Sequence, residues 1–453
     1  MNADEVTEVL TRALARAGHK DADAMAVHQE RGFARFADGC LSQHMALEEP
    51  RVHVRVMRER RVAEVSTSSL DEDSVVSALT RAETLASAMP VDEEFGGFPA
   101  ANSPSATAST AAPAHDPRER VDALTDPIAR IQAKGMHATG ALETRRTTHV
   151  VVNTQGLRRA HSSSFANFRI WALESAGGRG ASGFAQRVGR SLQDLDLSSA
   201  TDEALESAIR SKAPKALGPG HYDVVLAPDA VAELFEWMSF IAFGAETVHQ
   251  GTSPLADRFG EPVSGPQLTV REEPASPLSF ATPFDREGTL RERVELIECG
   301  VARGFVTDRR WAPRFGRQST GHAPWPSLLD SGAPEPSALV VAPGKDTDAE
   351  LLSRVKRGLY IRRLHYVNGL LETRRAVMTG LSRDGTFWVE NGKLQHAVHP
   401  LRFTDSILEA FARDAALGKE LSIIPPRWSD GASVATPAVF LPALHFTGVS
   451  SAS

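Results

Sequence analysis

The chain has 453 residues, of which 42% are hydrophobic and 24% charged, a composition typical of a globular protein and not of a disordered one. Its 50 Lys and Arg residues against 57 Asp and Glu residues give a net charge of −7, which lacks the basic excess of a dedicated nucleic-acid-binding protein. The two cysteines, Cys40 and Cys299, exclude a disulfide framework and a cysteine-rich zinc module.

The N-terminus is acidic and lacks the apolar segment of a secretory signal. The apolar run 237–245 is far shorter than the ~20 residues that span a bilayer. We therefore expect a cytoplasmic protein that does not associate with membranes.

Residues 1–98 are predicted to form an α/β domain. The opening segment has apolar residues at helical spacing and reaches Gly18, where the helix is expected to end. A second helix is expected between Ser69, which has the spacing of a capping box with Glu72, and Pro90. Strands are predicted for three segments between these helices, namely 45–47, 51–57 and 62–66.

Residues 99–117 contain almost no large apolar side chains. Such a segment cannot bury enough surface to offset the entropy of ordering, so we expect a linker or surface loop. Residues 118–218 are then expected to form a middle domain, which begins with a helix and continues into strands.

Residues 219–453 are expected to form a β-rich C-terminal domain. Strand 222–226 precedes a long helix from Pro228 to Gly251, whose apolar stripe should contribute strongly to the core. Strands and turns follow until a last helix at 405–417. The whole pattern predicts an α+β fold.

Several short motifs follow one another along the chain. The longest is GTSPLADRFGE at 251–261. The others lie at 35–37, 153–157, 283–288, 298–301, 319–322, 343–344, 356–360 and 389–392. In this order the motifs resemble the TldD/PmbA (TldE) family of bacterial peptidase proteins, and the resemblance covers nearly the whole chain. It implies an N-terminal α/β part, a middle segment and a β-rich C-terminal domain.

The resemblance also implies an assembly, in which a TldD-like and a TldE-like chain pair into a cytosolic peptidase. Such a pair degrades unfolded or extended peptides and trims leader peptides. The TldD-like chain carries His-Glu-x-x-x-His on the long helix and holds zinc or iron with a later cysteine. Here the three motif positions are Glu236, Trp237 and Ile241, no His-Glu dipeptide occurs, and no cysteine follows Cys299.

A catalytic zinc needs three protein ligands, and an isoleucine supplies none. The resemblance therefore implies the metal-free TldE-like member, with no cofactor of its own and zinc or iron in the partner chain. Glu236 is the one potential ligand left on the helix, and a solvated helix carboxylate is the favoured interpretation of it.

Other candidate catalytic or binding residues lie within the motifs. Asp285 and Glu287 are two residues apart and could form a carboxylate pair, although a turn or an interface is the favoured role. Thr320 and His322 belong to a Ser-Thr-Gly-His segment that could face a peptide, with turn formation as the favoured alternative.

Three further groove candidates lie later in the chain. His365 and Tyr366 occur together on a predicted strand and could carry acid–base chemistry, whereas a structural histidine is the favoured interpretation. Glu390 lies in the Val-Glu-Asn-Gly motif at 389–392.

These observations leave three functions open. The first is a non-catalytic subunit that presents sheet edges to an extended peptide beside a metal-bearing partner. The second is an autonomous hydrolase with a site rebuilt from His322, His365, Asp285 or Glu287. The third is a binding protein that modulates a target without proteolysis. We favour the first, because the losses are concentrated at the metal-ligand positions while the surrounding motifs remain.

Overall fold

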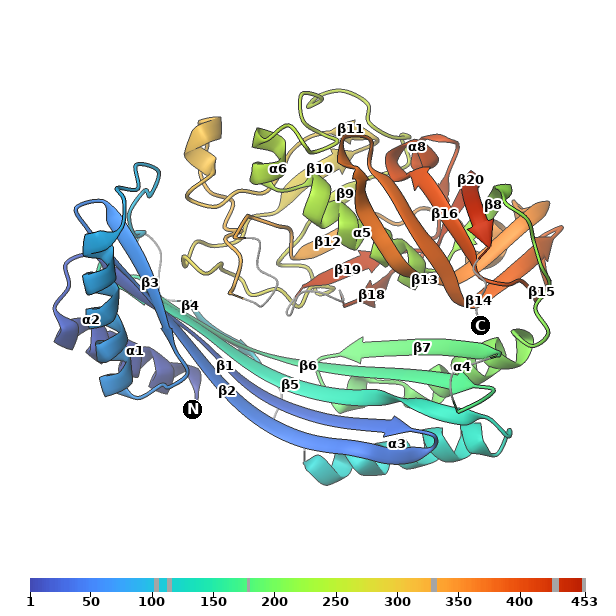
Figure 1. The fold of residues 1–453 in the computed structure, drawn as a ribbon, viewed down its shortest axis with the longest axis horizontal. Coiled ribbons are helices and arrows are strands. Elements are labelled where there is room, and N and C mark those ends of the chain that lie inside the picture. The colour runs from blue at the N-terminus through green and yellow to red at the C-terminus, as the bar shows by residue number, and fades with distance from the viewer. Residues whose placement is uncertain (102–105, 112–115, 177–179, 327–331, 426–431, 450–453) are drawn as a thin grey trace.

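The computed structural model describes residues 1–101, 106–111, 116–176, 180–326, 332–425 and 432–449. Its elements form three β-sheets with flanking helices, which confirms the predicted α+β class. The first half of the chain builds one long curved sheet, and the second half lies over the concave side of that sheet (Figure 1). None of the described helices is long and apolar enough to cross a membrane.

The N-terminal sheet has the strand order β3-β2-β1-β5-β6-β4, and β7 pairs with β6. β1 pairs with β5 along most of its length in antiparallel register. The expected division between residues 1–98 and 118–218 therefore does not correspond to a division between sheets. The strands are β1 (Ala22–Ala37), β2 (Cys40–Arg58), β3 (Arg61–Thr67), β4 (Ala106–Thr110), β5 (His137–Asn153), β6 (Arg158–Leu173) and β7 (Ser182–Gly189).

Two features of this sheet differ from the prediction. The expected strands 45–47 and 51–57 are parts of the single strand β2. Pro50 does not interrupt it, because β3 pairs with β2 only from Val52 onward and leaves Pro50 on a free edge, where a proline is tolerated. The expected linker 99–117 contains β4, which pairs in parallel with β6. Residues 102–105 and 112–115 of that segment lie outside the described residues.

Four helices pack on the N-terminal sheet: α1 (Ala3–Ala17), α2 (Glu72–Ala88), α3 (Pro117–Gln132) and α4 (Leu197–Arg210). The residues of β1, β2, β5 and β6 that they bury have even numbers, for example Ala24, Val150 and Phe168. Successive strand residues point to opposite faces, so the odd-numbered residues of β1, β5 and β6 point toward the C-terminal half.

The helix ends partly follow the predicted signals. α1 ends at Gly18, which has the left-handed φ of 71° that glycine adopts readily. α2 begins two residues later than predicted, because its N-cap is Asp71. The Asp71 side chain accepts a hydrogen bond from the Ser74 amide. The predicted cap, Ser69, instead donates its hydroxyl to the Asp71 carboxylate.

Two sheets form the C-terminal half, with the strand orders β13-β8-β20-β16-β14-β15 and β11-β10-β9-β12-β19-β18. β13 also pairs with β14, so five strands of the first sheet close into a ring. The strands are β8 (Gly220–Leu226), β9 (Val270–Glu272), β10 (Val294–Glu298), β11 (Val301–Ala302), β12 (Ala338–Val341), β13 (Arg357–Glu372), β14 (Val377–Glu390), β15 (Lys393–Ala397), β16 (Leu401–Ser406), β17 (Ala416–Leu417), β18 (Ser422–Ile424), β19 (Ser433–Thr436) and β20 (Val439–Val449).

The predicted helix from Pro228 to Gly251 is two helices, α5 (Pro228–Ala242) and α6 (Ala245–His249). The chain turns at Gly244, where a Cβ atom would lie 2.4 Å from the Pro334 carbonyl oxygen, so close backbone contact favours glycine. Two short helices complete the domain, α7 (Asp348–Ser353) and α8 (Ile407–Ala412). The last helix, predicted at 405–417, is shorter in the structure, because the strand β16 extends to Ser406 and α8 ends at Ala412.

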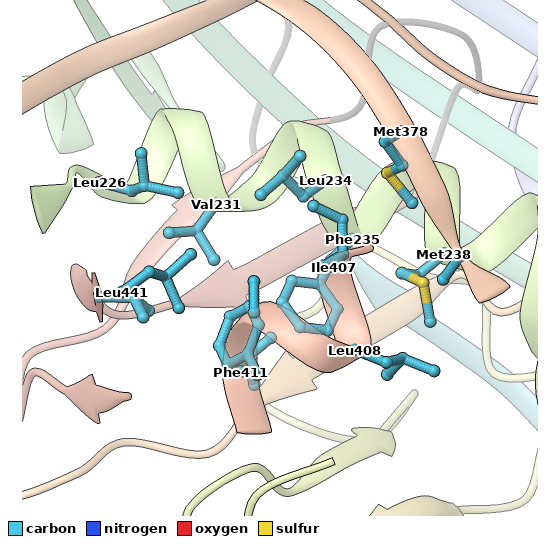
Figure 2. Packing of buried hydrophobic residues seen from close by; sticks show 14 of the residues in the cluster. Leu226, Val231, Leu234, Phe235, Met238, Met378, Ile407, Leu408, Phe411 and Leu441 are labelled. Carbon is cyan, nitrogen blue, oxygen red and sulfur yellow. The ribbon is translucent and has the colours of Figure 1, made fainter. Parts of the chain in front are cut away.

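The largest hydrophobic cluster surrounds α5. Figure 2 shows side chains of α5 packed against α8 and the neighbouring strands. Phe235 of α5 and Phe411 of α8 contact edge to face, with ring centroids 5.7 Å apart. Met238 and Ile241 belong to the same cluster and are 0% and 2% exposed. α5 is therefore held rigidly, and only one of its faces is left for a site.

Candidate functional site

A polar cavity of about 370 Å³ lies between α5 and the concave face of the N-terminal sheet. Its sheet wall consists of odd-numbered residues of β1, β5 and β6, as the alternation of the strands requires, together with Phe184 and Gln186 of β7. Four arginines, four carboxylates and several aromatic rings contribute to the lining, which comprises Arg31, Glu143, Arg145, Phe165, Asn167, Arg169, Trp171, Phe184, Gln186, Asp229, Ala232, Glu233, Glu236, Phe280, Arg363, Ile424, Pro425, Ala432 and Val434.

The helix wall of the cavity is acidic. Asp229, Glu233 and Glu236 follow one another at intervals of four and three residues, which places them on one face of α5. Asp229 forms an ion pair with Arg362 of β13, and Arg362 also contacts Glu203 of α4 at 2.6 Å. Glu233 and Glu236 carry the remaining negative charge of this wall.

The sheet wall is basic. Arg31 and Arg145 lie directly opposite each other on β1 and β5, where like charges repel. Glu143 offsets this repulsion, because its carboxylate lies 2.9 Å from Arg31 and 3.8 Å from Arg145. Arg169 adds a third guanidinium from β6. Phe165 supports Arg145, whose guanidinium carbon lies 4.9 Å from the ring centroid.

The three residues at the expected metal positions have different surroundings. Glu236 lines the cavity, Trp237 packs against Gly369 and Phe240, and Ile241 lies in the core. Within the described ranges, no three His, Cys, Asp or Glu side chains are grouped so that they could hold a metal ion. The residues at these three motif positions therefore do not supply the ligand set of a catalytic zinc.

Four of the candidates from the sequence come together in a second, buried cluster. The Asp285 carboxylate accepts hydrogen bonds from the amides of Glu287, Thr289 and Ala323 at 2.9, 2.9 and 3.0 Å. Asp285 therefore orders the 285–289 turn and joins it to the segment that contains His322. These contacts agree with the favoured interpretation of a turn.

His322 is fully buried in the same cluster. Its Nε2 atom lies 3.1 Å from the Glu272 carboxylate and its Nδ1 atom 2.9 Å from the Thr320 hydroxyl. That hydroxyl donates to the Thr307 carbonyl at 3.0 Å and accepts from the Thr307 amide at 2.7 Å. The Thr-His-Glu chain thus resembles a nucleophile with its base, but its hydroxyl is committed to the backbone and lies away from the cavity lining.

The remaining candidates lie elsewhere. The rings of His365 and Tyr366 on β13 are in contact at a tilted angle, with centroids 4.2 Å apart, and Tyr366 is 74% exposed. Glu390 is exposed at the end of β14. None of the three lines the cavity. Sequence reasoning missed the arginines of the sheet wall, although polar residues at odd positions between buried even positions were a signal for a second, polar face.

Charges also join the second cluster to the N-terminal sheet. Arg286 contacts Glu64 of β3 at 2.6 Å. Within the cluster itself, the amide of Arg309 donates a hydrogen bond to Glu287. Burial alone raises the pKa of Glu64, but His53 and Arg286 outweigh it and lower the pKa to about 2. The two halves of the chain are therefore joined by an ion pair between Arg286 and Glu64 in addition to apolar contacts.

Glu287 is expected to make stability depend on pH. Burial and the negative charge of Glu287 raise the pKa of Asp285 to about 7 and that of Asp308 to about 6. At these two carboxyl groups the folded protein binds more protons than the unfolded chain above about pH 4, so their contribution to the free energy of unfolding falls as the pH rises toward about 7. Glu287→Gln should reduce this fall by about 1.4 kcal/mol for each pKa unit recovered.

Urea unfolding of both proteins at pH 5, 6, 7 and 8 measures this effect. The exposed carboxylate Glu390 provides the control, and Glu390→Gln should leave the slope of the wild-type protein unchanged. An equal or steeper slope in Glu287→Gln would contradict the assignment.

Comparison with known proteins identifies the family to which this chain belongs. Residues 219–448 match the model of the PmbA/TldA metallopeptidase C-terminal domain. The chain belongs to the PmbA/TldD metallopeptidase family. Metalloprotease PmbA of Escherichia coli O157:H7, a similar family member, is 22% identical over 290 residues, which cover 62% of this chain and 60% of that protein.

The chain is also similar to a second protein and to a solved structure. A protein of Methanocaldococcus jannaschii, MJ0231, is 30% identical over 130 residues, which cover 28% of this chain and 31% of that protein. The chain thus matches between about a third and three fifths of the length of these relatives. The crystal structure of TldE from Thermococcus kodakarensis superposes with a TM-score of 0.84 at 19% identity, over 98% of this chain and 100% of that one, which shows a shared fold.

Proposed function

We propose that this chain is a TldE/PmbA-like subunit of a cytoplasmic heterodimeric peptidase. Its partner is a TldD-like chain that carries His-Glu-x-x-x-His and binds zinc or iron. The substrates are unfolded or leader peptides in extended form. The partner's metal would supply a Lewis acid and an activated water, while the residues of this chain bind and orient the peptide.

The donor set on α5 carries this proposal. Of the positions that correspond to the metal motif, Ile241 is 2% exposed within the core and Trp237 packs on Gly369. An isoleucine supplies no ligand atom, so Glu236 has no second donor at the motif positions of this helix. This arrangement supports a chain that has kept the family fold without the family's metal chemistry.

The end strand of one C-terminal sheet offers a place for an extended peptide. β18 is the last strand in its sheet and pairs with β19 along one edge. Its residue Ile424 also lines the cavity. A peptide that pairs with the other edge of β18 gains backbone hydrogen bonds and passes beside the charged walls. The peptide would need no catalytic residue from this chain.

Burial argues against an autonomous hydrolase built from the second cluster. Asp285 and His322 are both 0% exposed, and the Thr320 hydroxyl is occupied by backbone partners. A substrate would have to open the core of the domain to reach them. An autonomous hydrolase is therefore less well supported than the partner role.

Hydrolysis of an extended fluorogenic peptide tests the proposal. The purified chain alone should show no chelator-sensitive cleavage, whereas a mixture with a TldD-like partner should cleave the peptide. A partner whose motif glutamate is replaced by glutamine serves as the control and should leave the mixture inactive. Chelator-sensitive cleavage by the chain alone would overturn the proposal.

A further inference from the structure

The two walls of the cavity carry opposite charge. Arg31 and Arg145 of the sheet wall share the carboxylate of Glu143, and Arg169 is the third arginine of that wall. On the helix wall Asp229 is paired with Arg362, which leaves Glu233 and Glu236 facing the arginines. The remaining cavity arginine, Arg363, lies 3.2 Å from Asp384 and therefore adds little to either wall.

The strand register explains why the basic charge is concentrated. Arg145 of β5 lies opposite Arg31 of β1 and opposite Phe165 of β6. Glu143 is the next residue on the same face and lies opposite Asn167 of β6. Arg169 follows Asn167 on that face, so three arginines and one carboxylate, that of Glu143, lie on neighbouring strands of the same wall. This wall has an excess of positive charge over a short distance.

A ligand that matches these walls has a negative group at one end and a positive group at the other. A purely anionic or purely cationic ligand would be attracted by one wall and repelled by the other. The volume of about 370 Å³ lies at the small end of the range for ligand sites. The rings of Phe165 and Phe280 also contribute to the lining and suit an apolar side chain.

We infer that this cavity binds short peptides of about two or three residues through both free termini. Arg145 and Arg169 hold the α-carboxylate, and Glu233 and Glu236 hold the α-ammonium group. The inference rests on the proposed function, because a peptide with two free ends is what a peptidase releases. The metal-free chain would then hold a product next to the edge of β18.

Affinity should be modest. Arg145, Arg169, Glu233 and Glu236 all have partners within the chain, so a peptide must share or replace existing interactions. The net gain from each exchange is smaller than a new ion pair would give. The selectivity between free and blocked termini is therefore a better test than the absolute affinity.

Isothermal titration of the full chain, without metal or partner, measures this selectivity. The probes are Ala-Phe-Ala, its N-acetyl form, its C-terminal amide and the doubly blocked form. Each single block should weaken binding by about tenfold, since it removes one charged contact. Equal affinity for the free and doubly blocked peptides, or no binding of the free peptide, would overturn the inference.

Two variants assign the termini to the walls. Glu236→Gln should bring the affinity for the free peptide down to that for the N-acetyl peptide and leave the N-acetyl affinity unchanged. Arg169→Gln should bring the affinity for the free peptide down to that for the C-terminal amide and leave the affinity for the amide unchanged. Matched controls are Glu206→Gln and Arg210→Gln, two exposed residues of α4 outside the cavity lining, which should bind like the wild type.

A variant that loses binding of all four peptides together, with an unchanged melting temperature, would overturn the assignment of the termini. Mass spectrometry of the titrated sample separates the two proposals. Absence of binding with intact peptide contradicts the cavity assignment alone. Cleaved Ala-Phe-Ala contradicts the metal-free subunit.

Discussion

Replacing Arg55 by methionine is expected to lower the free energy of unfolding by about 3–5 kcal/mol. The guanidinium group lies against Asp23 of β1, with its Nε atom 3.1 Å from each carboxylate oxygen. It also lies 3.9 Å from Glu287 of the C-terminal half. Burial alone lowers the pKa of Arg55, but these carboxylates raise it overall. Methionine fills the space and leaves two buried negative charges without their cation.

The setting of Arg55 makes compensation by water difficult. The rings of Phe95 and Phe98 lie 5.8 and 5.5 Å from its guanidinium carbon, and Asp23 is 3% exposed. Urea unfolding at pH 7 measures the loss. Arg51→Met, at an exposed arginine 3.8 Å from Glu49, should change stability by less than about 0.5 kcal/mol. A loss below about 1 kcal/mol for Arg55→Met would contradict the role of Arg55 as a buried cation shared by Asp23 and Glu287.

Replacing Ile241 by histidine is expected to destabilise the protein by about 3 kcal/mol without creating metal binding. The isoleucine is 2% exposed among apolar neighbours, so an imidazole would lose their packing and bury polar nitrogens without partners. Ile241→Val keeps the apolar character and should cost about 0.5–1.5 kcal/mol.

The measurements for this pair are urea unfolding and zinc content after dialysis. A stable Ile241→His protein that retains one zinc per chain would contradict the account. That result would mean that the position faces the cavity together with Glu236 and that the site needs only one further ligand.

The helices and strands were largely predictable because their signals are local. Gly18 ends α1 as a glycine at a helix C-terminus should, and the apolar stripe of α5 predicted a core helix. The sheets were not predictable, because alternation shows which face is buried but not which strand is the neighbour. The paired residues of β1 and β5 lie more than a hundred positions apart in the sequence, and β4 pairs through its backbone in a segment without large apolar side chains.

The candidate site was predictable only in part. The motif positions identified Glu236 as the remaining polar group on α5, and the cavity contains it. The resemblance also led to Asp285 and His322, which are buried in the second cluster. The basic wall could not be derived, because Arg31, Arg145 and Arg169 come from three strands whose order depends on the whole sheet. Their odd positions showed a polar face but not what covers it.

The metal content of the chain tests the central claim most directly. The chain would be purified alone, without chelators, from cells supplied with zinc and iron, and analysed for both elements against protein concentration. The account predicts far less than one equivalent of either metal per chain. About one tightly held zinc or iron per chain would contradict it, and Glu236 with the cavity carboxylates would become the first residues to replace.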